Sequence, residues 1–208
     1  MAWLAGSSHS DARAFLARLV RLDPGALVRL RPAGEGAVAL WSRLPWGVLV
    51  CRGVAGSVPR DRTVLGSELA ATLVDGELPT SRDTDWRWSI PSAPGTVVER
   101  IPAADVRRVG AAAAETLRTA AAEGVGGRAV GSRMLRDALL DHVPIMVTTD
   151  DGSRIPVSQR LVQAVVRMGF VGEGPGDFVD VRISGPWTAL ACAYGSAWHR
   201  AAGSLLIG

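Results

Sequence analysis

The chain has 208 residues, of which 48% are hydrophobic and 21% charged, a balance that is typical of a folded globular protein and excludes a largely disordered one. Its formal net charge of +3 at pH 7 is small for a dedicated nucleic-acid binder, so the charge allows such a partner without implying one. All 23 basic residues are arginine, a bias typical of GC-rich genomes, and this weakens any argument from arginine abundance.

The first half of the chain is predicted to form a helix followed by an antiparallel β-meander. Ser8 and Asp11 mark a capped helix start, and Asp23-Pro24-Gly25 ends that helix. Short apolar runs separated by turn residues are typical of antiparallel strands. The three runs are 26–32, 36–44 and 46–54. A short helix over 65–74 and a polar connection over 76–85 are expected to follow.

The second half is expected to be more helical and to end in a β-hairpin. Hydrophobic periodicity predicts helices over 102–124, 129–141 and 156–168. A strand is expected over 143–149, and the final hairpin over 178–184 and 187–194. The predicted fold class is α+β. It has a helix-plus-meander subdomain over 1–75 and a helical α+β subdomain over 86–208, packed as one globular unit.

The beginning of the chain lacks the basic start and the apolar core of a secretory signal, and no apolar run is long enough to cross a bilayer. We therefore expect a cytoplasmic protein without a membrane partner. In a reducing compartment Cys51 and Cys192 are expected to remain thiols and to serve as small buried apolar residues.

The pattern Pro-Trp-x-x-Leu-x-Cys occurs twice, at 45–51 and 186–192. Because proline cannot donate a ladder hydrogen bond, each copy is predicted to open a strand at its proline. Alternation would place the leucine and cysteine of each copy on one face and the other apolar residues opposite, as in a strand buried on both sides. Each copy has one cysteine and no second ligand at zinc spacing, so the pattern favours packing over a metal or redox role.

The tripeptide Trp86-Arg87-Trp88 places two indoles on one side of an extended segment and Arg87 on the other. Because Trp and Arg dominate the hot spots of protein interfaces, these three are the predicted protein-interaction residues. The alternatives are stacking on a base or another planar ligand, and closure of the edge of a core.

The predicted helix over 156–168 carries a polar face opposite its apolar stripe, formed by Ser158, Gln159, Arg160, Gln163 and Arg167. Arg and Gln are side chains that read guanine and adenine in a major groove. The order of elements over about 103–194 resembles a winged helix-turn-helix domain. That resemblance implies nucleic-acid binding through Arg160, Gln163 and Arg167, with Arg128 and Arg133 on the phosphate backbone. A solvated helix face is the alternative interpretation.

A glycine-rich segment precedes the predicted helix over 129–141. Backbone N–H groups at a helix N-terminus can hold a phosphate, so Gly126, Gly127 and Ser132 are candidates for binding a small anion. The segment follows a helix instead of the strand that a dinucleotide fingerprint requires, and the absence of lysine from the sequence excludes a P-loop. A glycine-rich connection between helices is the alternative.

Catalytic motifs are sparse. His9, His142 and His199 form no H-E-x-x-H pattern, and no serine lies in G-x-S-x-G. We therefore predict no catalytic residue, metal ligand or cofactor. The preferred hypothesis is a non-catalytic cytoplasmic module that binds another protein. The alternatives are a nucleic-acid-binding protein and an enzyme that binds a small anion or nucleotide.

Overall fold

The protein is described by a computed structural model that covers residues 3–123 and 132–200, with side chains described over 3–119 and 137–200. The chain divides into two compact units. The first comprises Met1–Ile90 and Tyr194–Ala197, and the second comprises Pro91–Ala193 and Trp198–Gly208. The fold class is α+β, which confirms the prediction. No helix of the described part is both long and apolar enough to span a membrane.

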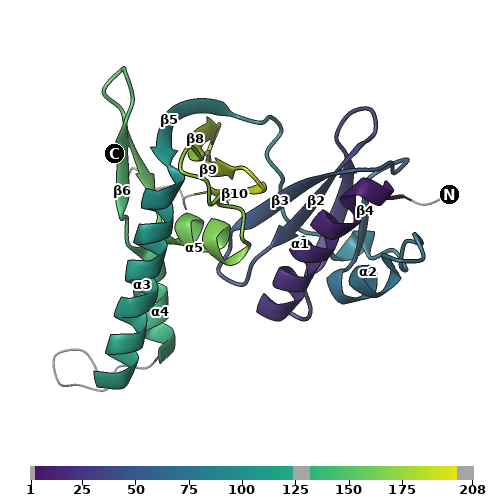
Figure 1. Cartoon of the computed structure of the whole chain (residues 1–208), viewed down its shortest axis with the longest axis horizontal. Helices are drawn as coiled ribbons and strands as arrows, with labels where there is room; N and C mark the ends of the chain where they lie inside the picture. The colour runs from purple at the N-terminus through teal and green to yellow at the C-terminus, as the bar shows by residue number, and fades with distance from the viewer. Residues whose placement is uncertain (1–2, 124–131, 201–208) are drawn as a thin grey trace. The chain divides into compact units, whose positions relative to one another are not determined.

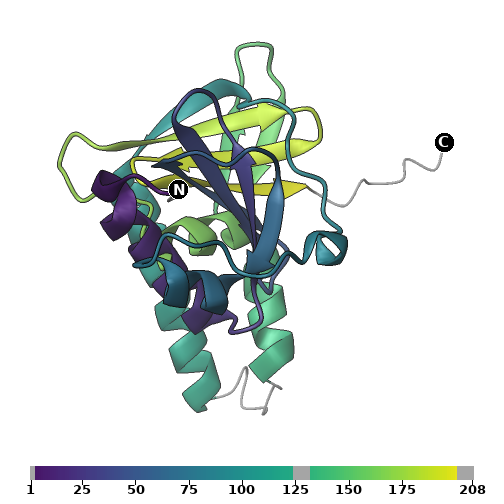
Figure 2. The same ribbon diagram turned by 90° about the vertical axis from the view of Figure 1, so that its right-hand side faces the viewer.

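The first unit contains the antiparallel strands β1 to β4, with helices packed on them (Figures 1 and 2). Its strands lie in the order β4 (Arg62–Leu65), β1 (Leu27–Pro32), β2 (Ala37–Arg43) and β3 (Leu49–Ala55). The helices are α1 (His9–Leu22) and α2 (Gly66–Thr72), and short 3₁₀ turns η1 and η2 lie at Gly6–Ser8 and Asp83–Asp85. Contacts join α1 to α2 and β3, and α2 to β4.

The core of this unit follows the two expected periodicities. The helical stripe of α1 is almost wholly buried, and so are alternate residues of β1 and β2. These residues are Phe15, Leu16, Leu19, Val28, Leu30, Val38 and Leu40. Ser8 is the N-cap of α1 as predicted, but its Oγ accepts a hydrogen bond from the backbone N of Ala55 (2.9 Å) instead of capping the helix. The cap residue therefore ties α1 to the end of β3.

The second unit places helices beside a second group of antiparallel strands. Strand β8 (Phe178–Ser184) pairs with β5 (Thr96–Pro102) on one side and β9 (Trp187–Cys192) on the other. Helices α3 (Ala103–Glu123) and α4 (Ser132–Asp141) lie side by side and both contact α5 (Gln159–Arg167), which also contacts β9 (Figures 1 and 2). A hairpin of β6 (Ile145–Thr148) and β7 (Arg154–Val157) joins α4 to α5. The last strand, β10, spans Gly195–Arg200.

Strands β4, β5, β7 and β10 are absent from the sequence-based prediction. Strands β4 and β7 have four residues each, which is too short for a period of two to stand out. Strand β5 shows no buried side in its pattern, because most of its residues are exposed. Its place in the sheet depends on pairing with β8, from which it is about 80 residues distant in the chain.

The first copy of Pro-Trp-x-x-Leu-x-Cys lies in a hairpin loop. Backbone N of Gly47 donates to O of Leu44 (2.9 Å), and N of Leu44 donates to O of Val48 (2.8 Å). Pro45, Trp46 and Gly47 therefore form a three-residue loop, whose last position needs the positive φ that Gly47 adopts (+87°). Strand β3 begins at Leu49, so the prediction of a strand that opens at Pro45-Trp46 is wrong.

The second copy has a different local structure. Ser184 pairs with Trp187, and Gly185 (φ +54°) and Pro186 form a two-residue turn of the kind that suits a twisted hairpin. Trp187 therefore begins β9, as predicted. Because the tryptophan lies in the loop of one copy and in the strand of the other, the repeat in sequence is not a repeat in structure.

Both cysteines are free thiols and half-buried. Burial raises the pKa of Cys51 to about 12. Burial, together with the nearby Asp180 carboxylate, raises the pKa of Cys192 to about 12 as well. At neutral pH both side chains are therefore protonated and chemically inert, because the thiolate is the reactive form.

Replacing Gly47 by alanine is expected to lower the free energy of unfolding by about 1–3 kcal/mol, because a Cβ is strained at positive φ. Gly53 of β3 is the matched control, since it has an ordinary φ and no atom within 4 Å of an added Cβ. Gly53→Ala is expected to change stability by less than about 0.5 kcal/mol. Urea unfolding followed by tryptophan fluorescence measures both, and equal effects would contradict the assigned loop.

Alkylation by iodoacetamide at pH 8 is expected to be at least about a hundredfold slower for the folded chain than for the chain in urea, because the raised pKa values lower the thiolate fraction about a thousandfold. A Ser57→Cys variant supplies the control, because Ser57 is exposed and a thiol there should react rapidly in the folded state. Mass spectrometry of each modified cysteine gives the rates. A native rate within tenfold of the unfolded rate at Cys51 or Cys192 would show that the thiols are open to solvent.

Candidate functional site

The segment around Trp86 and Trp88 lies over strands β1 and β2 of the first unit. The guanidinium of Arg29, on β1, lies 5.9 Å from the centre of the Trp86 ring, and that of Arg43, at the end of β2, lies 5.5 Å from the Trp88 ring. The two indoles meet edge to face with centroids 5.0 Å apart, and Nε1 of Trp86 donates to the backbone O of Trp88 (2.7 Å). Both indoles are half-buried and Arg87 is exposed, so the alternation predicted from the sequence is present.

Hydrogen bonds to β4 hold the preceding residues in place. The backbone N of Thr63 donates to Oδ1 of Asp83 (2.6 Å), and the backbone N of Arg82 donates to O of Thr63 (2.7 Å). Hydrogen bonds from Ser81 and Thr63 hold the pKa of the Asp83 carboxyl below its ordinary value, although partial burial opposes this. The segment from Ser81 to Trp88 is therefore an anchored strap, which presents Arg87 to solvent on a rigid aromatic support.

Helix α5 does not expose the predicted nucleic-acid-reading face. Gln163 is only 7% exposed; its Nε2 donates to O of Gly110 (3.1 Å) and its Oε1 accepts from Nε of Arg167 (3.2 Å). Arg160 forms an ion pair with Asp141 (Nη2 to Oδ1, 2.7 Å), while Arg167 is exposed. The prediction of an exposed polar face is wrong for Gln163, because α5 is enclosed by α3, α4 and β9.

The other predicted nucleic-acid and anion contacts cannot be placed by their side chains. Arg128, Gly126 and Gly127 lie outside the described residues. Arg133 and Ser132 belong to α4, but their side chains also lie outside the described part. Anion binding by this segment stays a prediction.

A polar group joins the ends of three elements in the second unit. The Asp141–Arg160 ion pair connects α4 to α5, and both charges act on His199 of β10. Burial lowers the pKa of His199, the Arg160 cation lowers it further, and the Asp141 carboxylate partly opposes this. His199 is therefore mainly neutral at pH 7. Among the described residues no three His, Cys, Asp or Glu side chains are grouped so as to hold a metal ion.

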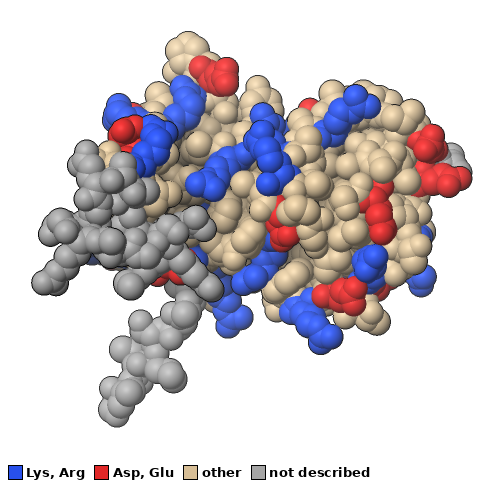
Figure 3. Space-filling model, turned by 90° about the horizontal axis from the view of Figure 1, so that it is seen from below, with Lys and Arg blue, Asp and Glu red and all other residues tan. Residues whose placement is uncertain are grey.

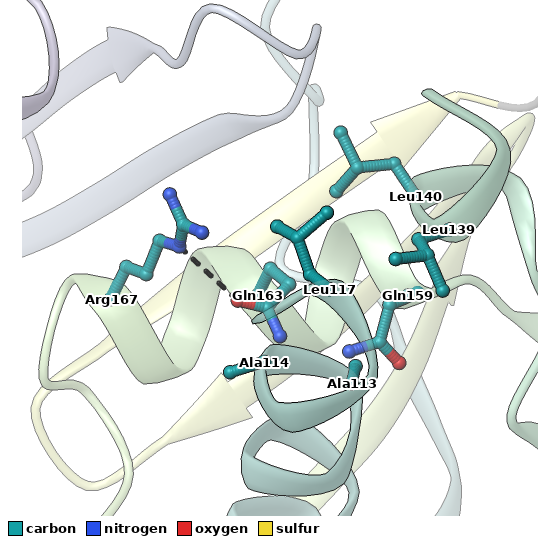
Figure 4. A pocket seen from close by; sticks show the side chains of 8 residues that line it. All are labelled: Ala113, Ala114, Leu117, Leu139, Leu140, Gln159, Gln163 and Arg167. Atoms are coloured by element: carbon teal, nitrogen blue, oxygen red, sulfur yellow. Dashed lines mark hydrogen bonds between the residues drawn. The ribbon is translucent and has the colours of Figure 1, made fainter. Parts of the chain in front are cut away.

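An apolar pocket lies between α3, α4 and α5 (Figure 4). It consists of two adjoining hollows with cavity volumes of about 30 and 440 Å³, which share Ala113, Leu139 and Gln159. We call it the α3–α5 pocket. Gln159 is 2% exposed and its Nε2 has no hydrogen-bond partner. From the sequence, Gln159 belongs to the exposed polar face of its helix. No pattern in the sequence signals a pocket, because the alanines that line it on α3 have the spacing of any helix.

On the face of the molecule drawn in Figure 3, charged residues of both signs are interspersed. On the face drawn in Figure 3, arginine side chains recur with Asp and Glu side chains among them. Several arginines form ion pairs within one helix or between neighbouring strands, as in Arg108–Asp105 of α3 and Arg100–Asp180 of β5 and β8. This distribution agrees with the small net charge.

Comparison with known families divides the chain near the boundary between the two units. Residues 2–89 match the domain of unknown function DUF8010, and residues 90–204 match the domain of unknown function DUF8185. The second match covers more than half of the chain. The chain belongs to the DUF8185 family. No curated protein matches it by sequence.

Solved structures of DNA polymerase sliding clamps have a fold similar to that of this DUF8185 family member. The β subunit of DNA polymerase III from Thermotoga maritima is 11% identical, with a TM-score of 0.56 over 95% of this chain and 63% of that chain. The sliding clamp from Pseudomonas aeruginosa is 10% identical, with a TM-score of 0.55 over 92% of this chain and 62% of that chain. The clamp from Caulobacter crescentus is 10% identical, with a TM-score of 0.54 over 92% and 63% of the two chains.

These identities show likeness of fold alone, and the chain spans less than two thirds of the length of the clamp chains. The fold is sliding-clamp-like. The resemblance of 103–194 to a winged helix-turn-helix domain is therefore corrected, since both glutamines of the helix expected to read DNA are buried and a β-hairpin separates that helix from α4.

Proposed function

We propose that this protein is a non-catalytic module that binds another protein. The observation that carries the proposal is the likeness of its fold, over 92–95% of the chain, to proteins described as DNA polymerase sliding clamps and as subunits of DNA polymerase III. Those proteins are named for their part in a larger assembly. A shared fold does not by itself transfer function, so the surface of this chain must supply the rest of the argument.

The Ser81–Trp88 strap is the surface that we propose for the partner. Its indoles are partly open to solvent and held by hydrogen bonds and arginine contacts, so little conformational entropy is lost when a partner packs on them. Arg87, which lies between the two tryptophans in sequence, is exposed. Half-exposed tryptophans beside an arginine have the composition of an interface hot spot.

A second candidate function is association with DNA, and it is favoured by the same likeness to sliding clamps of a DNA polymerase. In the second unit, α3 carries the exposed arginines Arg108 and Arg118, whose partners Asp105 and Glu115 lie on the same helix. Exposed ion pairs of this kind contribute little stability, so the guanidinium groups can exchange a carboxylate for a phosphate at small cost. The modest net charge predicts weak binding.

Charge reversal at Arg87 is expected to weaken partner binding at least about tenfold while leaving the melting temperature within about 2 °C, because the side chain is exposed. Arg13→Glu is the matched control, since Arg13 is an exposed arginine on α1 of the same unit. Wild type, Arg87→Glu and Arg13→Glu chains are immobilised and used to capture proteins from a lysate of the cells that encode the chain. Mass spectrometry then quantifies each captured protein.

A partner retained by wild type and Arg13→Glu but depleted with Arg87→Glu supports the proposal, and calorimetry with the purified partner then gives the affinity. If every retained protein is retained equally by both variants, the strap is not the binding surface.

For DNA, affinity for a labelled duplex is expected to fall steeply between about 50 and 200 mM salt. The double variant Arg108→Gln/Arg118→Gln is expected to reduce the slope of log K against log salt by about 2, because each phosphate contact contributes about 0.9. Fluorescence anisotropy measures the slope, and Arg13→Gln/Arg60→Gln, two exposed arginines of the first unit, is the control. No binding at low salt, or equal slopes for both double variants, would remove this candidate.

A further inference from the structure

Two glutamines one turn apart on α5 differ in how their amides are satisfied. Gln163 donates to O of Gly110 on α3 and accepts from Arg167, so both ends of its amide are bonded. Gln159 is more deeply buried, at 2% against 7% exposure, yet its Nε2 has no partner. A buried donor left without a partner is destabilising, and such groups are rare in folded proteins. The exception requires a physical explanation.

The unpaired donor belongs to the wall of the α3–α5 pocket. Gln159 lines both of its hollows, and Figure 4 shows its side chain extending toward α3, beside Ala113. The remaining wall is mainly apolar, with alanine and leucine most frequent, and its other polar side chains are Thr116, His142, Gln163 and Arg167. A few polar groups placed in a mainly apolar cavity are the usual composition of a small-molecule site.

The packing of α3 on α5 explains why space remains there. A Cβ at Gly110 would lie 3.0 Å from Cγ2 of Val166, so glycine lets the two helices approach closely at that level. Near Gln159, α3 presents Ala112 and Ala113, whose methyl groups are too short to fill the space toward Leu139 and Pro144. The pocket therefore follows from a close helix contact next to a run of small residues.

We propose that the α3–α5 pocket binds a small, uncharged and largely apolar molecule that bears a carbonyl oxygen, which accepts a hydrogen bond from Nε2 of Gln159. A ketone, ester or amide has this chemistry. A carboxylate fits less well at Gln159, because Nε2 is a neutral donor and Nε of Arg167, on the wall of the smaller hollow, already donates to Gln163. Thr116, on the same wall, already donates its hydroxyl to O of Ala112 (3.0 Å). The site is separate from the strap of the proposed protein partner and does not depend on it.

Cyclohexanone and methylenecyclohexane test the proposal, because they have nearly the same shape and only the ketone has an acceptor. The ketone at about 10 mM is expected to shift the side-chain amide resonances of Gln159 in ¹H–¹⁵N spectra and to bind about fivefold more tightly than the alkene. Gln159→Met keeps the size of the side chain but removes the donor. This variant should bind both compounds equally, with a melting temperature unchanged or raised.

Two further variants separate the proposed site from a structural effect. Gln163 also borders the smaller hollow, but both ends of its amide are already bonded. Gln163→Met, the matched control, should therefore lower the melting temperature by about 2–4 °C through its lost hydrogen bonds, while the preference for the ketone remains. Ala113→Leu fills the space shared by both hollows and should abolish binding of both compounds.

Three results would overturn the proposal. These are equal affinity of the wild type for ketone and alkene, a ketone preference that survives in Gln159→Met, and Gln159 resonances that do not move. Arg87→Glu should bind the ketone as the wild type does. A failure of the proposed protein interaction at the strap can therefore be distinguished from a failure of the proposed ligand binding in the pocket. If Ala113→Leu does not fold, the comparison of Gln159→Met with Gln163→Met decides whether the proposal holds.

Discussion

Helix α5 is enclosed by α3, α4 and β9, so its polar side chains must find partners inside the second unit. Gln163 does so with the backbone of Gly110, and Arg160 does so with Asp141. Gln159 does not, and it faces the α3–α5 pocket instead. The burial of one helix thus determines which of its polar residues are structural, which can reach solvent, and which one remains open to a ligand.

In the first unit, helices and an irregular segment cover the strands of the sheet. Its helices α1 and α2 pack on the strands, and the Ser81–Trp88 strap lies over β1 and β2. Indoles suit this position because their rings cover apolar backbone and side chains while an arginine stacks on them. The strap leaves Arg87 exposed, so the same residues that complete the packing also form the surface that we propose for a partner.

This chain and the sliding clamps have similar folds although only 10–11% of their residues are identical. What is shared is the arrangement of helices and antiparallel strands, which many sequences of suitable pattern can form. Within this chain, the two copies of Pro-Trp-x-x-Leu-x-Cys are the converse case, because one sequence pattern has two different local structures. The position of one neighbouring glycine decides whether the tryptophan lies in a loop or in a strand, because a glycine with positive φ follows the tryptophan in one copy and precedes the proline in the other.

Local patterns in the sequence determined the α+β class, the positions of α1, α3 and α5, and the strands that alternate strongly, because periodicity and turn residues act over a few neighbours. They also determined that Trp86 and Trp88 share a side opposite Arg87. Only the tertiary structure decided the edge strand β5, the burial of Gln163 and the unpaired amide of Gln159. Two glutamines on one helix face look alike in sequence. Their different environments arise from where Gly110 and Ala113, some 50 residues away, bring α3 against α5.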